Sequence, residues 1–307
     1  MRNIREKAMK CLFFLAACVS VAAVVLICAF LFANGIPAIR EIGPLKFLLG
    51  TTWKPANGLY GNLPMIIGSL YVTAGALVIG VPVGILTAVF MARFCPGQIY
   101  RPIKSAVNLM AGIPSVVYGF FGLVVLVPLV RDTVGGRGMS VLTASVLLGL
   151  MILPTVISVS ETSIRAVPQS YYEGGLALGA SHERSVFYTV LPAAKSGIFA
   201  GVVLGIGRAV GETMAVMMVA GNQAVIPESI TAGVRTLTAN IVLEMGYSTD
   251  LHREALIGTA VILFVFILII NVSLSLFIPA STKIFQIHWR SRAYTGNNAG
   301  KSQKSRV

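Results

Sequence analysis

The chain has 307 residues, of which 56% are hydrophobic and only 11% are charged, and its mean hydropathy is +0.83. Since about a quarter of the residues in a soluble domain are charged, this composition excludes an ordinary soluble fold and favours a surface that faces lipid. The net charge of +13 comes mostly from basic residues at the edges of apolar runs, which is typical of membrane orientation and not of a nucleic-acid partner.

The N-terminal segment combines a basic start with a long apolar run. Residues 1–10 carry four Lys or Arg, and the apolar run extends from Cys11 to about Ala33. Because a signal peptide has a hydrophobic region of only ~7–15 residues, we expect this run to be retained as a first membrane span.

Six apolar segments are each long enough to cross a hydrocarbon core about 30 Å thick, which takes ~20 helical residues. Pro82 and Pro114 predict kinks in the second and third, and the fifth contains the charged residues Arg208 and Glu212. The predicted spans are Cys11–Ala33, Met65–Ala92, Ser105–Val130, Ser140–Ser160, Gly197–Ala220 and Ala255–Ile278.

The distribution of Lys and Arg between the spans predicts the orientation of the chain. Sixteen fall in the predicted inner segments and seven in the outer ones, so both termini are expected in the cytoplasm. The longest outer segment contains Trp53 and Tyr60, whose rings suit the headgroup level of a membrane. The inner segments are 1–10, 93–104, 161–196 and 279–307, and the outer ones are 34–64, 131–139 and 221–254.

No enzyme motif is present in the sequence. It lacks the phosphate loop of Gly, four residues and Gly-Lys-Ser or Gly-Lys-Thr, so ATP binding of the Walker type is not expected. It also lacks the His-Glu-x-x-His and Gly-x-Ser-x-Gly patterns, and its His and Cys residues have no metal-ligand spacing. We therefore expect no catalytic residue, no metal and no cofactor.

The inner segment 161–196 has the pattern of two short helices outside the bilayer. Pro168 suits the start of a helix over 169–178, and Gly179 suits a tight or left-handed turn. Ser181 is a good cap for a second short helix, which is expected to run until the chain re-enters the membrane at Leu191 and Pro192. A compact, exposed element of this kind suits docking in a groove of another protein.

This segment resembles the EAA loop of permease subunits in ABC importers. That pattern has Glu-Ala-Ala, three residues, Gly, nine residues, Ile, one residue and Leu-Pro. The sequence departs from it at Gly174, Gly175 and Thr189. The resemblance implies a coupling helix that inserts into a cleft on an ATPase subunit, and the alternative is an interfacial hairpin without a partner. The matching residues are Glu173, Gly179, Leu191 and Pro192.

The fifth predicted span carries the candidate substrate pathway. Arg208 and Glu212 are four residues apart, so on a continuous helix they share a face and can pair. Charges at membrane depth usually face a water-filled path or each other. In one interpretation Arg208 presents N–H donors to a passing oxyanion and Glu212 orients it; in another the two form a structural ion pair. A third has the pair open and close as access alternates.

The same region resembles the phosphate-specific transport permeases of bacteria. Residues 208–213 read Arg-Ala-Val-Gly-Glu-Thr, and residues 214–216 read Met-Ala-Val, as in the PstC-type subunit. The resemblance extends from about residue 10 to 280, with further agreement at 53–55, 60–64 and 111–119. In the last stretch a kinked, close-packed helix and a pathway role for Ser115 or Tyr118 both remain open.

The resemblance implies an all-α, polytopic fold with six transmembrane helices, of the type I (MetI-like) ABC importer permease. It implies phosphate as substrate, a PstA-type sister permease, an ATP-binding subunit dimer, an extracytoplasmic phosphate-binding protein and membrane lipid as partners. Another oxyanion such as molybdate or sulfate, or a peptide, is the alternative cargo. A stand-alone channel or secondary transporter is less favoured, because only Glu212 is a carboxylate of the required kind and no internal repeat is found.

The chain is therefore expected to divide into three parts. Residues 1–64 form a cytoplasmic stretch, the first span and an outer loop, and residues 65–278 form the transmembrane domain that contains the coupling loop 161–196. Residues 279–307 form a basic cytoplasmic tail, which is expected to be disordered because it is polar and poor in apolar residues.

Overall fold

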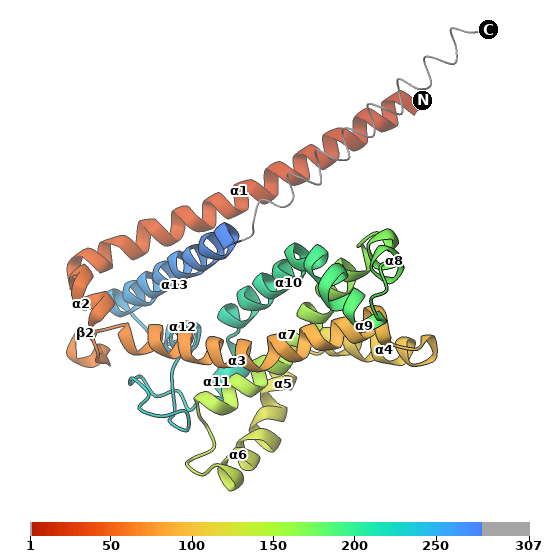
Figure 1. Cartoon of the computed structure of the whole chain (residues 1–307). Coiled ribbons are helices and arrows are strands. Elements are labelled where there is room, and N and C mark those ends of the chain that lie inside the picture. The colour runs from red at the N-terminus through yellow and green to blue at the C-terminus, as the bar shows by residue number, and fades with distance from the viewer. Residues whose placement is uncertain (1, 278–307) are drawn as a thin grey trace. The chain divides into compact units, whose positions relative to one another are not determined.

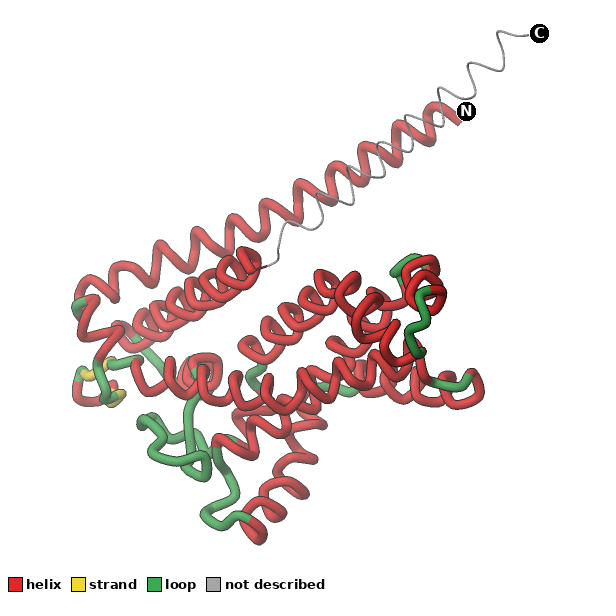
Figure 2. Tube along the Cα trace, viewed as in Figure 1, coloured by secondary structure: helices red, strands yellow, loops and turns green. Residues whose placement is uncertain are grey.

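The computed structural model describes residues 2–277, so the predicted tail 279–307 lies outside the described residues. The described chain is mostly helical, with one small β-hairpin (Figure 2). The helices are α1 (Arg2–Ile42), α2 (Pro44–Leu49), α3 (Leu63–Val89), α4 (Gly97–Gly112), α5 (Ser115–Phe121), α6 (Val127–Thr133), α7 (Val141–Arg165), α8 (Gln169–Ala177), α9 (His182–Ser185), α10 (Leu191–Gly211), α11 (Met214–Val219), α12 (Leu237–Met245) and α13 (Asp250–Phe277). The strands are β1 (Trp53–Lys54) and β2 (Leu59–Tyr60), the 3-10 helix is η1 (Pro55–Asn57), and the π-helices are η2 (Phe90–Phe94), η3 (Gly122–Leu126) and η4 (Val186–Val190).

The chain forms two compact units, each assembled from three separate stretches of sequence. Among the described residues, the first unit comprises 2–79, Ile113–Met151 and Ala209–Ile267, and the second comprises Gly80–Gly112, Ile152–Arg208 and 268–277. Several long helices, including α3 and α7, therefore contribute one end to each unit.

In the first unit, α1 and α13 lie side by side (Figure 1). The rings of Phe32 and Phe264 meet edge to face with centroids 5.9 Å apart. A Cβ added to Gly35 would lie 3.2 Å from the Cα of Gly258 and 2.7 Å from the side chain of Val261. The absence of a side chain at Gly35 thus lets the two backbones approach closely.

The β-hairpin of the first unit folds back onto its helices. Trp53 pairs with Tyr60 across the two strands, and both rings pack in a buried cluster with Phe47, Met65 and Leu237. The two aromatic side chains are only 6% and 7% exposed. Their shared place in the strand register turns both rings into the protein core, and their depth at the headgroup level stays a prediction.

In the second unit, three glycines one turn apart on α10 face α7. A Cβ at Gly197 would overlap the hydroxyl of Ser163, and one at Gly205 would lie 3.0 Å from Val156. A Cβ at Gly201, between them, would lie 3.2 Å from Val159 and 3.3 Å from Ser160 of α7. Small residues at this spacing let two helices approach closely in lipid, where burial of apolar surface does not drive association.

Each of the three π-helices ends two residues before a proline. Pro96 follows η2, Pro128 follows η3 and Pro192 follows η4. Proline lacks an N–H and its ring collides with the carbonyl four residues earlier in a regular helix, whereas a π turn pairs groups five residues apart. The chain continues as helix through Pro128 and Pro192, and it leaves the helix at Cys95, before Pro96.

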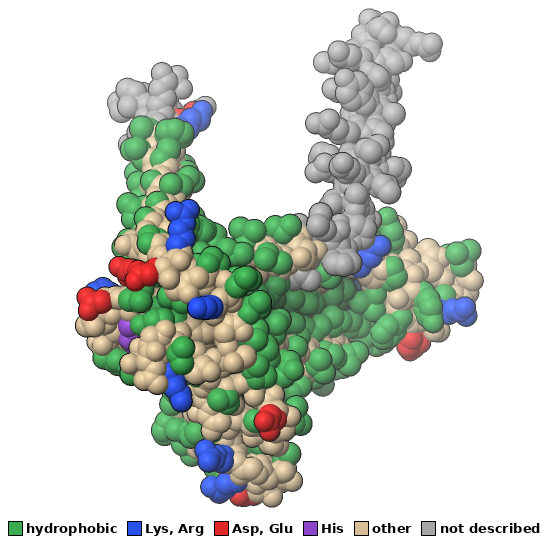
Figure 3. All heavy atoms as spheres, turned by 90° about the vertical axis from the view of Figure 1, so that its left-hand side faces the viewer, with side chains coloured by type: hydrophobic (Ala, Val, Ile, Leu, Met, Phe, Trp, Pro, Cys, Tyr) green, Lys and Arg blue, Asp and Glu red, His purple; other side chains and the backbone are tan. Residues whose placement is uncertain are grey.

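Six helices of the described residues are long and apolar enough to cross a membrane, as predicted. Hydrophobic side chains also cover much of the face shown in Figure 3, where charged side chains are few. The candidate spans are Met9–Ile42, Leu63–Phe94, Ser115–Thr133, Val141–Arg165, His182–Gly211 and Asp250–Ser273.

Two of the predicted spans are interrupted by a break in the helix. The third was predicted over Ser105–Val130, but α4 ends at Gly112 and α5 begins at Ser115. Pro114 has an extended backbone at this junction (φ −59°, ψ 143°) and disfavours helix at the residue before it, so the expected kink is a complete break. The fifth was predicted over Gly197–Ala220, but its helix ends at Gly211.

Candidate functional site

The predicted coupling loop is a helical hairpin, as expected. Its first helix is α8, and Gly179 follows with a left-handed φ of +82°, a conformation that favours glycine. The hydroxyl of Ser181 then accepts a hydrogen bond of 3.3 Å from the backbone N–H of Arg184, which caps α9. We call the segment from α8 through α9 the coupling hairpin.

The second helix of the coupling hairpin does not stop at Leu191 and Pro192, contrary to the sequence prediction. It runs from α9 through η4 into α10 without a break. The π turn of η4 accommodates Pro192, which would otherwise end the helix. The hairpin is thereby joined to a membrane span by continuous helix.

The tip of the coupling hairpin is exposed and partly apolar. Leu178, beside the Gly179 turn, is 91% exposed, and Leu176 and Tyr171 are also exposed. Glu173 lies on the same exposed helix. Exposed apolar side chains among polar ones are typical of protein docking surfaces.

The two helices of the hairpin touch at Gly175. A Cβ there would lie 2.7 Å from the hydroxyl oxygen of Ser185, which is itself buried. Around Gly174, by contrast, a Cβ would meet nothing within 4 Å. The two departures from the EAA pattern therefore differ: one glycine is required by a close contact and the other is not.

A buried carboxylate joins α4 and α7 in the second unit. Glu161 is 2% exposed and accepts hydrogen bonds from Tyr100 (2.7 Å), Lys104 (2.7 Å) and Arg165 (2.9 Å). The hydrogen bond to Glu161 raises the pKa of the Tyr100 phenol. A carboxylate with three donors is well stabilised despite its burial, so this contact fixes α4 against the end of α7.

The candidate pathway residues lie at the end of α10. Arg208 is in the last turn of that helix, where a cation interacts favourably with the helix dipole. Glu212 is the first residue beyond it, and its carboxylate accepts the backbone N–H groups of Thr213 and Ala215, each at 3.1 Å. The carboxylate thus caps α11, and the reasoning from a shared helix face fails because the helix ends at Gly211. A pathway role for the two residues stays a prediction.

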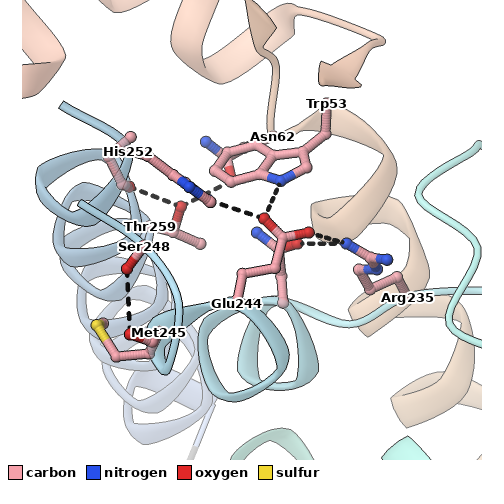
Figure 4. Close-up of polar contacts among 10 residues, drawn as sticks. Trp53, Asn62, Arg235, Glu244, Met245, Ser248, His252 and Thr259 are labelled. Atoms are coloured by element: carbon pink, nitrogen blue, oxygen red, sulfur yellow. Dashed lines mark hydrogen bonds and ion pairs between the residues drawn. The ribbon is translucent and has the colours of Figure 1, made fainter. Parts of the chain in front are cut away.

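A second polar cluster lies in the first unit, within the predicted outer segments (Figure 4). Glu244 of α12 accepts a hydrogen bond of 2.8 Å from the indole of Trp53 and pairs with Arg235 at 2.6 Å. Its other contact is with the Nε2 atom of His252 on α13, at 2.9 Å. Glu244 is 7% exposed, so it ties a strand, a loop and two helices together.

Sequence reasoning missed both carboxylate centres. Trp53 and Glu244 are 191 positions apart, and no local pattern indicates that they meet. For Glu161 a weak signal exists, because an acid four residues before Arg165 at the end of an apolar run can pair with it on the same helix face.

The comparisons with known proteins identify a family. The sequence pattern described as "Binding-protein-dependent transport system inner membrane component" matches residues 80–283. The chain is 38% identical over 266 residues to the probable ABC transporter permease protein YqgH of Bacillus subtilis, covering 83% of this chain and 86% of that protein. It is 35% identical over 256 residues to the phosphate transport system permease protein PstC of Mesorhizobium japonicum, covering 76% and 78%.

Solved transporters share the fold. A chain of the MetNI methionine ABC transporter in an inward-facing conformation matches with a TM-score of 0.57 and 20% identity, covering 75% of this chain and 99% of that one. A chain of a bacterial alginate ABC transporter matches with a TM-score of 0.57 and 15% identity, covering 85% and 92%. The predicted all-α, MetI-like fold is therefore confirmed.

Proposed function

Because the chain belongs to the family of binding-protein-dependent transport system inner membrane components, we propose that it carries inorganic phosphate across the cytoplasmic membrane as the permease subunit of an ABC importer. The relatives named as phosphate permeases support this substrate. They are 35% identical over 76% of this chain in Mesorhizobium japonicum and 30% identical over 81% in Methanocaldococcus jannaschii.

The observation that carries the proposal is the coupling hairpin. It is an exposed helix–turn–helix with an apolar tip at Leu178, continuous through α9 with a membrane span. We place the ATP-hydrolysing subunits of the importer on this tip, with Glu173 and Gly179 at the contact. Nucleotide-driven closure of those subunits would move the hairpin, and α10 with it.

The chain itself supplies a path and a mechanical link, with ATP hydrolysis assigned to the partner. An extracytoplasmic binding protein delivers phosphate to the outer side, and a PstA-type sister permease completes the path. Arg208 donates N–H groups to the phosphate oxygens, which a guanidinium matches in geometry and charge. Glu212 holds the start of α11 and so fixes the chain directly after Arg208.

Uptake by the purified complex in lipid vesicles tests this function. Wild-type complex with ATP inside should import phosphate in preference to sulfate and molybdate. Arg208→Ala should abolish uptake and leave the complex assembled, whereas Lys195→Ala, an exposed cation on the same helix, should import normally. Normal uptake by the Arg208 variant excludes its pathway role, and preference for another oxyanion overturns the assigned substrate.

We propose that both termini and the coupling hairpin are cytoplasmic, on the strength of the Lys and Arg distribution. Leu178→Cys and Arg137→Cys, both exposed positions, serve as a matched pair in a chain whose four native cysteines are replaced. A membrane-impermeant maleimide added to intact cells should label only position 137. Labelling of position 178 under these conditions contradicts the orientation.

A further inference from the structure

The first helix of the coupling hairpin is attached to the second unit mainly by side chains. No residue of α8 is buried, and a break at residues 166–168 separates it from α7. On its other side, α9 is continuous with α10 through η4. A force applied to the hairpin therefore reaches α10 through the backbone, and it reaches other helices only through the side chains that α8 and α9 present to them.

His182 is the side chain at which α8, α9 and η2 meet. Its Nδ1 atom lies 2.7 Å from the hydroxyl of Tyr172 on α8. Its ring packs edge to face against Phe94 of η2, with centroids 4.7 Å apart. A hydrogen bond at one ring nitrogen fixes the orientation of an imidazole, so the Tyr172 hydroxyl holds the ring of His182 in its contact with Phe94.

Arg93 of η2 makes a second contact with α8. Its guanidinium lies 6.0 Å from the ring centroid of Tyr172 and donates to the side-chain oxygen of Gln169 at 3.4 Å. It also donates to the backbone oxygen of Ile164 on α7, at 3.1 Å. The cation and the ring attract each other, so Arg93 links α8 to the ends of two other helices.

We propose that Arg93, Phe94, Tyr172 and His182 form a joint that transmits movement of the coupling hairpin to η2 and to the end of α7. Tyr172 and His182 are positioning residues in this joint, and neither contacts the substrate. The proposal rests on the proposed function, since it assumes that an ATPase moves the hairpin. With the joint intact, α10, η2 and α7 move together; with it loosened, the hairpin moves α10 alone.

The test compares two tyrosines, one inside and one outside the coupling hairpin, in the full importer, reconstituted in vesicles with its sister permease, ATPase subunits and binding protein. Tyr172→Phe removes the hydroxyl that contacts His182 and keeps the ring. Tyr188→Phe is the matched control, because Tyr188 lies on η4 outside the coupling hairpin, is 78% exposed, and its hydroxyl makes no hydrogen bond among the described residues. The measured quantity is phosphate imported per ATP hydrolysed, together with binding of the ATPase subunits.

Tyr172→Phe should bind the ATPase and hydrolyse ATP as wild type does, and it should import about fivefold less phosphate per ATP, the factor expected from one hydrogen bond worth ~1 kcal/mol. Tyr188→Phe should match wild type. His182→Phe, which keeps a ring against Phe94, should show the same loss of coupling as Tyr172→Phe.

Two results would overturn the proposal that these residues form a joint. One is a Tyr172→Phe complex with the same phosphate-to-ATP ratio as the Tyr188→Phe control. The other is a Tyr172→Phe complex that no longer binds the ATPase, which would mean that the hydroxyl only folds the hairpin. Either leaves the proposed function standing as long as the wild-type importer takes up phosphate. Absence of ATP-driven uptake by wild type would instead refute the function itself.

Discussion

Replacing Gly174 by alanine should strengthen the coupling hairpin, whereas the same change at Gly175 should leave it unchanged or weaken it. Alanine is favoured over glycine in a helix by about 1 kcal/mol, and at Gly174 the new methyl group meets nothing within 4 Å. At Gly175 it would lie 2.7 Å from the hydroxyl oxygen and 3.1 Å from the Cβ of Ser185, which is only 1% exposed. Overpacking of this kind costs roughly 1–3 kcal/mol, which outweighs or cancels the helical gain.

Hydrogen exchange of peptides from α8 measures the difference, on permease purified without ATPase subunits. Protection at α8 should rise about fivefold in Gly174→Ala, since 1.4 kcal/mol corresponds to a factor of ten. In Gly175→Ala it should stay level or fall by up to ~30-fold, the factor for about 2 kcal/mol. Adding Ser185→Ala should restore part of the lost protection, because it removes the hydroxyl oxygen that the new methyl group meets. That hydroxyl has no hydrogen-bond partner among the described residues, so its removal breaks no hydrogen bond.

The contrast between the two sites is the decisive result. If both alanine variants exchange alike, the close contact between α8 and α9 does not limit the hairpin. If Gly175→Ala is the better protected of the two, the packing argument is refuted, because helix propensity alone would then account for the data.

Three further predictions concern other parts of the chain. Glu244→Gln replaces the acceptor of Trp53, Arg235 and His252 by a weaker one and should reduce the free energy of unfolding by about 3 kcal/mol, seen as a lower melting temperature. Glu228→Gln, at an exposed position, should change the melting temperature little. Gly197→Ala forces a methyl group into α7 and should lower the melting temperature, whereas Gly207→Ala, with open space around it, should not. Burial raises the pKa of the Tyr60 phenol, so its stabilising contribution is complete below about pH 10 and is lost as the pH rises through the raised pKa; Tyr60→Phe should make the melting temperature less sensitive to pH above 10.

Local sequence patterns predicted the spans and the coupling hairpin because both depend on neighbours in the chain. An apolar run of ~20 residues identifies a span, and the cap at Ser181 and the turn at Gly179 depend on a few adjacent residues. The break after Gly211 was missed, because it depends on a carboxylate that turns back to cap the next helix. Apolar periodicity does not report such a contact.

Contacts between distant segments were beyond the reach of the sequence. Glu244 meets Trp53 only because the β-hairpin folds back onto α12 and α13. The same holds for the contact of His182 with Phe94, which brings together two predicted inner segments. Both contacts depend on how the helices pack against one another. Small residues such as Gly197 set this packing, and an apolar sequence contains many small residues that could do so equally well.

The wide turn η4 holds one extra residue without changing the rotational phase of the helix that follows it. A π turn contains one residue more than an α turn, and each helical residue advances the chain by about 100° and 1.5 Å. Deleting one residue from η4 would convert it to an ordinary α turn and keep Gly197 and its two companions facing α7, but it would bring the ring of Pro192 against the carbonyl four residues earlier. Inserting one further residue into the helix between Ser181 and Leu191 would instead rotate α10 by about 100° and turn these glycines away from α7.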